Sequence, residues 1–254
     1  MENVVTLSPV TRFSNRVENY VKYRPSYPET LIPFFEEKLG LTQEQRIADI
    51  GSGTGLFASI LLKKGYRVTC IEPNEEMRKA GEKMLGQYLG FESRKHPAEQ
   101  TGLRKHSVEL ITVAQAFHWM EPVATKKEFL RILKPGGHIV LAWNLRLSNT
   151  PFLKEYAELK AKYELDADHS LRQNIPKLQE FFEPQTMIID SFPNIQMLDF
   201  DALKGQLLSS SYIPLPGHST YDEMISALAK LFVTYNENGL VRMEFETRLY
   251  WAKM

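Results

Sequence analysis

A glycine-rich stretch, DIGSGTG at residues 49–55, constrains the fold of this chain more than any other feature. It follows a short apolar run at 46–50, which predicts a buried strand. Glycines at alternate positions, Gly51, Gly53 and Gly55, let the backbone turn closely around a ligand, and the N-terminus of a following helix would point at that ligand. The stretch therefore predicts a strand, a ligand-binding turn and a helix in succession.

Strand and helix patterns alternate through the first 145 residues. Apolar runs predict strands at 46–50, 66–71, 91–96, 108–114 and 138–143, with helices at 56–64, 75–89 and 123–133 and a turn at 134–137. Asn74 is the expected N-cap of the second helix. Strands that alternate with helices pair in parallel through right-handed crossovers. The order predicts an α/β fold with an open, doubly wound, mostly parallel sheet.

The pattern changes after residue 144. Residues 145–185 are helical and irregular, and the clearest helix is expected at 151–165, which favours a lid. Short strands are expected at 187–192 and 195–200, then a helix at 221–239 and a final strand at 241–252. The sheet is therefore expected to resume near the end of the chain.

Charge, cysteine and histidine content narrow the function. The 254 residues contain 31 basic and 31 acidic side chains, so we expect no nucleic-acid partner and no acidic membrane surface as partner. Cys70 is the only cysteine, which fits a reducing compartment. The scattered histidines form no H-E-x-x-H motif, so no protein-bound metal is predicted. Without a signal pattern or a long apolar run, we expect a cytoplasmic protein, and the oligomeric state is not predicted.

The spacing of the glycines selects among nucleotide-like ligands. A phosphate-binding loop needs Lys-Ser/Thr after its last glycine, but Leu56 and Phe57 follow Gly55. The dinucleotide pattern G-x-G-x-x-G fails as well, because its third glycine would stand at position 56. Asp49 before the turn and Glu72 at the end of the second strand suit a ligand with an adenosine ribose but no pyrophosphate. This combination favours S-adenosylmethionine.

These stretches carry a resemblance to a known family. DIGSGTG, VTCIEPNEEM at 68–77 and LRILKPGGHIVLAWN at 130–144 resemble the motifs of class I S-adenosylmethionine-dependent methyltransferases. YRPSYP at 23–28 and AQAFHWM at 114–120 resemble a methyltransferase type 11-like subgroup near the trans-aconitate methyltransferases. The resemblance implies a Rossmann-like, seven-stranded sheet of order 3-2-1-4-5-7-6 with the last strand antiparallel, and a helical lid.

The resemblance also implies a division of one domain, residues 1–254. We expect an N-terminal arm at 1–35, a cofactor-binding core at 36–144, a lid and substrate-side insertion at 145–220, and a C-terminal helix and strand at 221–254.

The resemblance assigns a set of cofactor-binding residues. They are Asp49, Gly51, Gly53, Gly55, Glu72, Pro73, Met77, Ala98, Glu99 and Gln115. Asp49 would hold the ammonium group of the cofactor, directly or through water, and Glu72 would accept both ribose hydroxyls. Pro97 stands where related enzymes often have an acid that binds the adenine amino group. Glu99 is either the substitute partner or a solvated loop residue.

On the acceptor side, His118 is the first candidate general base and Tyr23 the second. The expected substrate-binding residues are Tyr20, Arg24, Tyr27, Trp119, Trp143 and Asn144. The structural alternative for the residues of the arm is packing of its tyrosines and prolines, with Arg24 in solvent. Arg146 and the polar loop at 209–219 are further candidates for the acceptor site.

The sequence thus predicts methyl transfer from S-adenosylmethionine to a small-molecule acceptor by in-line displacement. A carboxylic acid is the preferred acceptor, from Arg24 and the subgroup resemblance, and it would need no general base. Two alternatives stay open: an NAD-dependent oxidoreductase, and a non-catalytic S-adenosylmethionine-binding protein.

Overall fold

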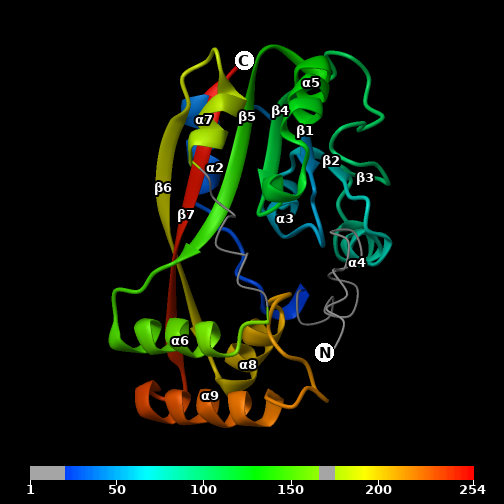
Figure 1. Ribbon diagram of the computed structural model, residues 1–254. Helices are drawn as coiled ribbons and strands as arrows, with labels where there is room; N and C mark the ends of the chain where they lie inside the picture. Colours follow the sequence, from blue (N-terminus) through cyan, green and yellow to red (C-terminus); the bar gives the residue numbers. More distant parts are fainter. Residues whose placement is uncertain (1–20, 166–174) are drawn as a thin grey trace.

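The computed structural model describes residues 21–165 and 175–254. Its centre is a seven-stranded sheet of order β3-β2-β1-β4-β5-β7-β6 (Figure 1). The strands are β1 (Arg46–Ile50), β2 (Arg67–Ile71), β3 (Phe91–Arg94), β4 (Val108–Ala114), β5 (Leu133–Arg146), β6 (Ile188–Leu198) and β7 (Val241–Lys253). Strand β7 runs antiparallel to both of its neighbours, whereas the pairs from β3 to β5 are parallel. The predicted fold class and strand order are confirmed.

Helices cover both faces of the sheet. On one face, α2 (Leu31–Leu39) and α3 (Leu56–Leu62) share a hydrophobic core with Leu85, the last residue of α4 (Glu75–Leu85). On the other face, α5 (Pro122–Ile132) and α7 (Ile175–Phe182) bury their apolar side chains. The sheet is therefore enclosed between two layers, as a doubly wound fold requires.

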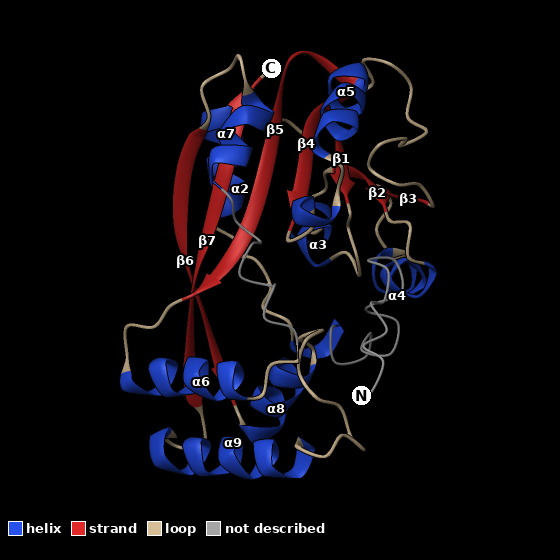
Figure 2. Ribbon diagram, in the orientation of Figure 1, coloured by secondary structure: helices blue, strands red, loops and turns tan. Residues whose placement is uncertain are grey.

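A third hydrophobic cluster lies beyond the carboxyl end of β5. There α6 (Pro151–Lys162), α8 (Phe200–Leu208) and α9 (Tyr221–Tyr235) pack around the ends of β6 and β7. Figure 2 shows these three helices below the sheet, apart from the helices that cover its faces. The helical layer expected after residue 144 is thus present, and α9 is part of it.

Local side chains explain where several helices begin. The Oδ1 atom of Asn74 accepts a hydrogen bond from the Met77 N–H at 2.9 Å, so the predicted N-cap of α4 is confirmed. Thr150 does the same for α6, where its hydroxyl accepts from the N–H of Leu153 at 3.2 Å. Each cap satisfies a backbone donor that has no partner inside its helix.

The turn predicted at 134–137 lies inside strand β5. Leu133 pairs with Val108, and the next pair joins His138 to Leu110. Because β5 advances from 133 to 138 while β4 advances from 108 to 110, the intervening residues form a bulge. The glycines there mark an irregularity within the strand rather than the connection before it.

The strands predicted at 187–192 and 195–200 are one strand, and the second prediction is wrong at its end. Strand β6 pairs with β7 without a break from Ile188 to Leu198. Asp199 then caps α8, because its Oδ1 atom accepts from the Ala202 N–H at 2.8 Å. Helix α2 likewise begins at Leu31, inside the expected arm.

The described residues contain neither a helix that could span a membrane nor a metal-binding group. None of their helices combines the length and apolar character that crossing a membrane requires. Histidine, cysteine, aspartate and glutamate side chains of the same residues do not gather into a metal-binding group.

Candidate cofactor and acceptor site

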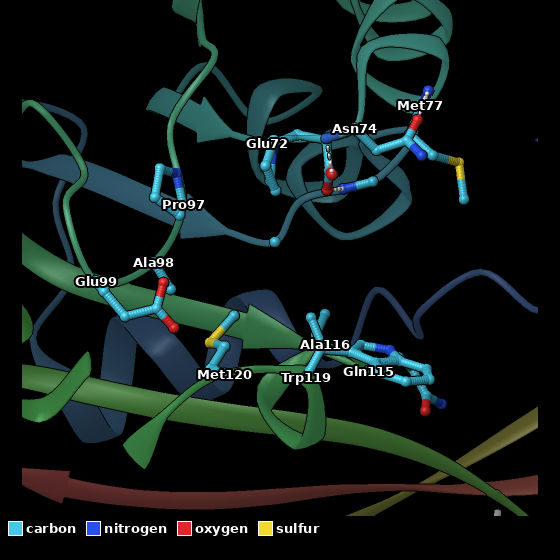
Figure 3. A pocket seen from close by; sticks show the side chains of 14 residues that line it. Glu72, Asn74, Met77, Pro97, Ala98, Glu99, Gln115, Ala116, Trp119 and Met120 are labelled. Carbon is cyan, nitrogen blue, oxygen red and sulfur yellow. Dashed lines mark hydrogen bonds between the residues drawn. The ribbon is translucent and has the colours of Figure 1, made fainter. Parts of the chain in front are cut away.

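A cavity of about 260 Å³ lies at the carboxyl ends of β1, β2 and β4. It is lined by Gly51, Gly53, Glu72, Pro73, Asn74, Met77, Pro97, Ala98, Glu99, Ala114, Gln115, Ala116, Trp119 and Met120. Figure 3 shows Glu72 and Asn74 on one side of this cavity and Ala116 and Met120 on the opposite side. Ligands of open α/β sheets bind at this edge, outside the carboxyl ends of the strands.

The acid at the end of β2 is fixed by the backbone around it. Glu72 accepts the Gly53 N–H through Oε2 and the Asn74 N–H through Oε1, both at 2.8 Å. Burial raises the pKa of Glu72, while the N–H groups of Asn74 and Gly53 and the charge of Arg78 act against that rise. A carboxylate has about four acceptor positions, so each oxygen keeps one for a ligand hydroxyl.

The three glycines of the turn meet different surroundings. A side chain at Gly51 would place its Cβ 2.6 Å from the Cβ of Ala116, and one at Gly55 would lie 2.3 Å from Leu85 Cδ1. A Cβ at Gly53 would meet nothing within 4 Å, although φ there is +56°. Gly51 and Gly55 therefore permit close packing, whereas Gly53 presents bare backbone to the open space of the cavity.

Asp49 lies beneath the turn and does not line the cavity. Its side chain is fully buried, and Oδ1 accepts the Thr112 hydroxyl at 2.7 Å, which joins the ends of β1 and β4. Burial raises the pKa of Asp49 to about 7, against the hydrogen bonds from Thr112 and the backbone of Ala58. As placed, Asp49 supports the glycine turn and offers the cavity no exposed surface.

Gln115 combines a cavity position with an unusual backbone. Its φ is +57°, in the left-handed region that residues other than glycine rarely adopt. Its N–H donates to the carbonyl of Ala142 at 2.9 Å, and its Nε2 donates to the carbonyl of Asn144 at 3.2 Å. Such conformations concentrate at ligand-binding sites. This backbone places Gln115, one of the expected cofactor-binding residues, in the cavity wall, whereas the sequence pattern gave no indication of the positive φ.

A second, smaller cavity of about 40 Å³ lies on the other side of the glycine turn. It is lined by Arg24, Pro25, Tyr27, Gly51, Ser52, Gly53, Thr54, Leu56, Phe57, Ala114, Gln115 and Asn144. Because both cavities share Gly51, Gly53 and Gln115, they meet across the turn. The second cavity connects the glycine turn to the segment that precedes α2.

Hydrogen bonds hold that segment against the sheet. Asn144 donates from Nδ2 to the Ser26 carbonyl at 3.2 Å, and Asn194 donates to the same carbonyl at 2.7 Å. Arg24 donates to the Ser209 carbonyl at 3.0 Å. Asn144 and Arg24 thus have structural contacts and also line the second cavity.

Aromatic side chains predicted for the acceptor side lie in different environments. Tyr27 is buried with its ring centre 4.8 Å from that of Phe57, at the second cavity. Trp143 is buried in the sheet core with its ring centre 5.6 Å from that of Tyr250. The ring of Tyr23 occupies the space that a side chain at position 205 would need. The predicted acceptor residues therefore do not converge on one point.

The remaining predicted residues complete this comparison. Trp119 lines the first cavity, and the ring centre of His118 lies 4.7 Å from that of Trp119, although His118 does not line either cavity described above. Tyr20 falls outside the described residues. Glu99 lines the first cavity and accepts the Glu121 N–H at 3.0 Å.

Five cavity residues had no predicted ligand role: Asn74, Pro97, Ala114, Ala116 and Met120. Asn74 was expected only as a helix cap, and its position two residues after Glu72 is the signal that could have found it. Ala114, Ala116 and Met120 belong to AQAFHWM, in which the resemblance assigned roles only to Gln115, His118 and Trp119. The side chains of alanine and methionine carry no chemical signature in a sequence.

Comparison with known proteins gives evidence of function that does not depend on the geometry of the site. Residues 48–141 match the family model described as a methyltransferase domain. An uncharacterised methyltransferase of Mycobacterium tuberculosis is 33% identical over 147 residues, which cover 58% of this chain and 58% of that protein. The chain therefore spans less than two thirds of the length of this curated relative.

Solved structures share the fold. A candidate type II methyltransferase of Anaeromyxobacter dehalogenans superposes with a TM-score of 0.70 at 20% identity, over 91% of this chain and 98% of that one. Phosphoethanolamine N-methyltransferase 2 of Haemonchus contortus, solved with phosphomonomethylethanolamine and S-adenosylhomocysteine, gives a TM-score of 0.57 at 14% identity, covering 96% and 58%.

The family match coincides with the site. Residues 48–141 include the ends of β1, β2 and β4 and the connections that line the first cavity. All residues that line the first cavity therefore lie within the part of the chain that matches the methyltransferase domain model.

Proposed function

We propose that this chain transfers a methyl group from S-adenosylmethionine to a small-molecule acceptor, with a carboxylic acid as the preferred class. Glu72 carries the proposal: a carboxylate at the end of β2, held by two backbone donors, with acceptor positions left for a ribose. The proposal includes a place near the trans-aconitate methyltransferases, a cytoplasmic location and no nucleic-acid partner, supported by the resemblance and the balanced charge.

The residues of the first cavity fit S-adenosylmethionine. Pro73, Met77 and Met120 give apolar surface for the adenine, and Glu72 gives acceptors for the ribose hydroxyls. The bare backbone of Gly53 leaves room for the methionine part. When bound, S-adenosylmethionine supplies a methyl group on a sulfonium, which is the electrophile of the reaction.

The chain itself would contribute alignment and exclusion of water. Residues that line both cavities, such as Gln115, would hold the acceptor atom against the methyl group and in line with its bond to sulfur, as in-line transfer needs. A carboxylate acceptor is already a nucleophile and needs no base. For an acceptor that must lose a proton, His118 on the turn beside Trp119 is the first candidate base and Tyr23 the second.

Calorimetry tests the cofactor and separates the alternatives. S-adenosylmethionine, S-adenosylhomocysteine and NAD are titrated into the wild type, Glu72→Ala and the control Glu37→Ala, an exposed acid on α2. We expect both sulfur ligands to bind the wild type and the control, and Glu72→Ala to bind at least about 100-fold more weakly. Binding of NAD alone would replace the proposal with an oxidoreductase.

Transfer of a labelled methyl group tests the acceptor. Carboxylic acids and phenols are offered with labelled S-adenosylmethionine, and turnover of any of them excludes a protein that only binds the cofactor. Methylation of phenols without methylation of carboxylic acids would contradict the preferred acceptor class but leave the methyltransferase proposal intact.

A further inference from the structure

A basic side chain lies where the end of β5 meets α6. Arg146 is the last residue of β5, and its guanidinium carbon lies 4.9 Å from the ring centre of Tyr156 on α6 and 5.8 Å from that of Phe245 on β7. A guanidinium is planar and carries its N–H donors in that plane. Stacking on aromatic rings therefore covers its face and leaves the donors at its edge for a ligand.

Arg146 and Tyr156 have donors without acceptors. In the described part of the chain, no carboxylate forms an ion pair with Arg146, and its buried Nε has no hydrogen-bond partner. Tyr156 is fully buried, and its hydroxyl also has no hydrogen-bond partner there. A buried polar group without a partner destabilises the fold, and a ligand with acceptor atoms would satisfy it.

The hydroxyl of Tyr156 stays a donor at neutral pH. Burial raises the pKa of Tyr156 to about 12, although the positive charges of Arg146 and Arg24 lower it. Tyr156 lies one turn before Lys160 on α6, and Lys160 donates to the hydroxyl of Ser210. Arg24, which lines the second cavity, donates to the carbonyl of the adjacent Ser209, so this part of α6 lies on the side of the second cavity. A group bound there would belong to the acceptor rather than to the cofactor.

A second buried cation stands one turn further along α6. Lys160 is 5% exposed, and its Nζ donates to the Tyr212 hydroxyl at 2.7 Å and to the Ser210 hydroxyl at 3.2 Å. Tyr212 also raises the pKa of the Tyr156 hydroxyl. Basic and hydroxyl side chains from the arm, β5, α6 and the loop after α8 therefore gather in one region, a composition suited to an anion.

We propose that Arg146 and Tyr156 bind an anionic group, a carboxylate or a phosphate, of the methyl acceptor. Arg146 gives a charged pair of donors in a plane, and Tyr156 adds one neutral donor. The pair selects for acceptors that carry a second group besides the atom that is methylated. This inference rests on the proposed function, because it assumes that the neighbouring cavities hold a cofactor.

Direct binding tests the inference without knowledge of the acceptor. Succinate, benzoate and inorganic phosphate, with succinamide as the neutral control, are titrated by calorimetry into the protein saturated with S-adenosylhomocysteine. We expect at least one anion to bind at concentrations below about 10 mM and succinamide not to bind. The affinities of succinate and benzoate, compared with that of phosphate, show whether the site prefers a carboxylate or a phosphate.

Matched variants locate the binding. Arg146→Met is expected to weaken anion binding about 10- to 100-fold, and Tyr156→Phe a few-fold, with the affinity for S-adenosylhomocysteine unchanged. Arg242→Met is the control, because Arg242 lies on β7 with an exposed side chain paired to Glu244. Tyr156→Phe should not lower Tm, since the lost hydroxyl had no partner. If Arg146→Met does not fold, Arg146→Lys keeps the charge and removes the paired donors.

The outcomes separate this inference from the proposed function. Binding of S-adenosylhomocysteine without binding of any anion would overturn the inference alone, as would anion binding that Arg146 variants leave unchanged. Absence of S-adenosylhomocysteine binding would overturn the proposed function and, with it, the basis of the inference.

Discussion

The two sides of the proposed site, the first cavity with Glu72 and the second cavity with Arg24 and Asn144, differ in how far apart along the chain their hydrogen-bonded residues lie. Glu72 binds the backbone of Asn74, two residues away, and of Gly53, 19 residues away. On the acceptor side, the hydrogen bond from Arg24 to Ser209 spans 185 residues, and that from Asn144 to Ser26 spans 118. The difference teaches that neighbouring motifs can shape the proposed cofactor site, whereas the proposed acceptor site exists only once distant segments have met.

The largest effect should come from the buried acid beneath the glycine turn. The pKa of Asp49 is about 7 in the folded protein and near 3.8 when unfolded, so its contribution to stability is present below about pH 4 and is lost as pH rises through about 7. Asp49→Asn keeps an acceptor for Thr112 but does not titrate. We expect the variant to gain up to about 4 kcal/mol relative to the wild type between about pH 4 and pH 8.

Urea unfolding across this pH range measures the difference. Glu72 titrates in both proteins, so the difference between the two curves reports Asp49 together with its coupling to the charge of Glu72. Parallel curves would mean that Asp49 ionises normally and that the turn is not supported by a protonated acid.

The next effect sharpens the role of the cofactor side. Glu72→Gln replaces one carboxylate oxygen by an NH₂ group, which opposes one of the two backbone N–H donors and offers fewer acceptors to a ribose. We expect the affinity for S-adenosylhomocysteine to fall about 100-fold, a loss of about 3 kcal/mol. Calorimetry measures it, with Glu37→Gln as control. Equal affinities of Glu72→Gln and Glu37→Gln would mean that Glu72 does not bind the ribose.

Substitutions at Gly51 and Gly53 distinguish the role of tight packing from the role of ligand contact. Gly51→Ala should destabilise the fold by about 2–3 kcal/mol because its Cβ meets Ala116 at 2.6 Å and φ is positive. Gly53→Ala meets no atom and should lose about 1 kcal/mol, from its positive φ alone. Yet Gly53→Ala should weaken S-adenosylhomocysteine about tenfold. Chemical unfolding and calorimetry together check the pair, and normal affinity in Gly53→Ala would show that no ligand approaches there.

The smallest effect belongs to the acceptor side. Thr150→Ala removes the side-chain cap of α6 and should lower the free energy of unfolding by about 1 kcal/mol. Because α6 packs in the third cluster and not against the glycine turn, the affinity for S-adenosylhomocysteine should stay within about twofold. A large loss of affinity would show that the two sides are coupled, and the comparison above would no longer hold.

Particular residues show how far sequence reasoning reached. Gly53 was assigned from the glycine-rich motif and Glu72 and Met77 from the motif that follows it, through the family resemblance, and the structure places all three at the first cavity. Trp143 was assigned by its place at the end of a predicted strand, and the structure puts it in the core because strand β5 continues to Arg146. A residue near a strand end can face a ligand or the core, and the sequence alone does not give the length of the strand.

The sequence by itself determined the alternation of strands and helices and the glycine turn, because these depend on local periodicity and on the few residues that a tight turn accepts, and the family resemblance supplied the strand order. Only the tertiary structure decided which residues line the proposed acceptor side. Arg146 meets Tyr156 because β5 reaches the helical layer, and Gln115 enters the cavity wall through a backbone conformation that its neighbours impose. Both depend on contacts between distant segments, which carry no signature in the order of residues.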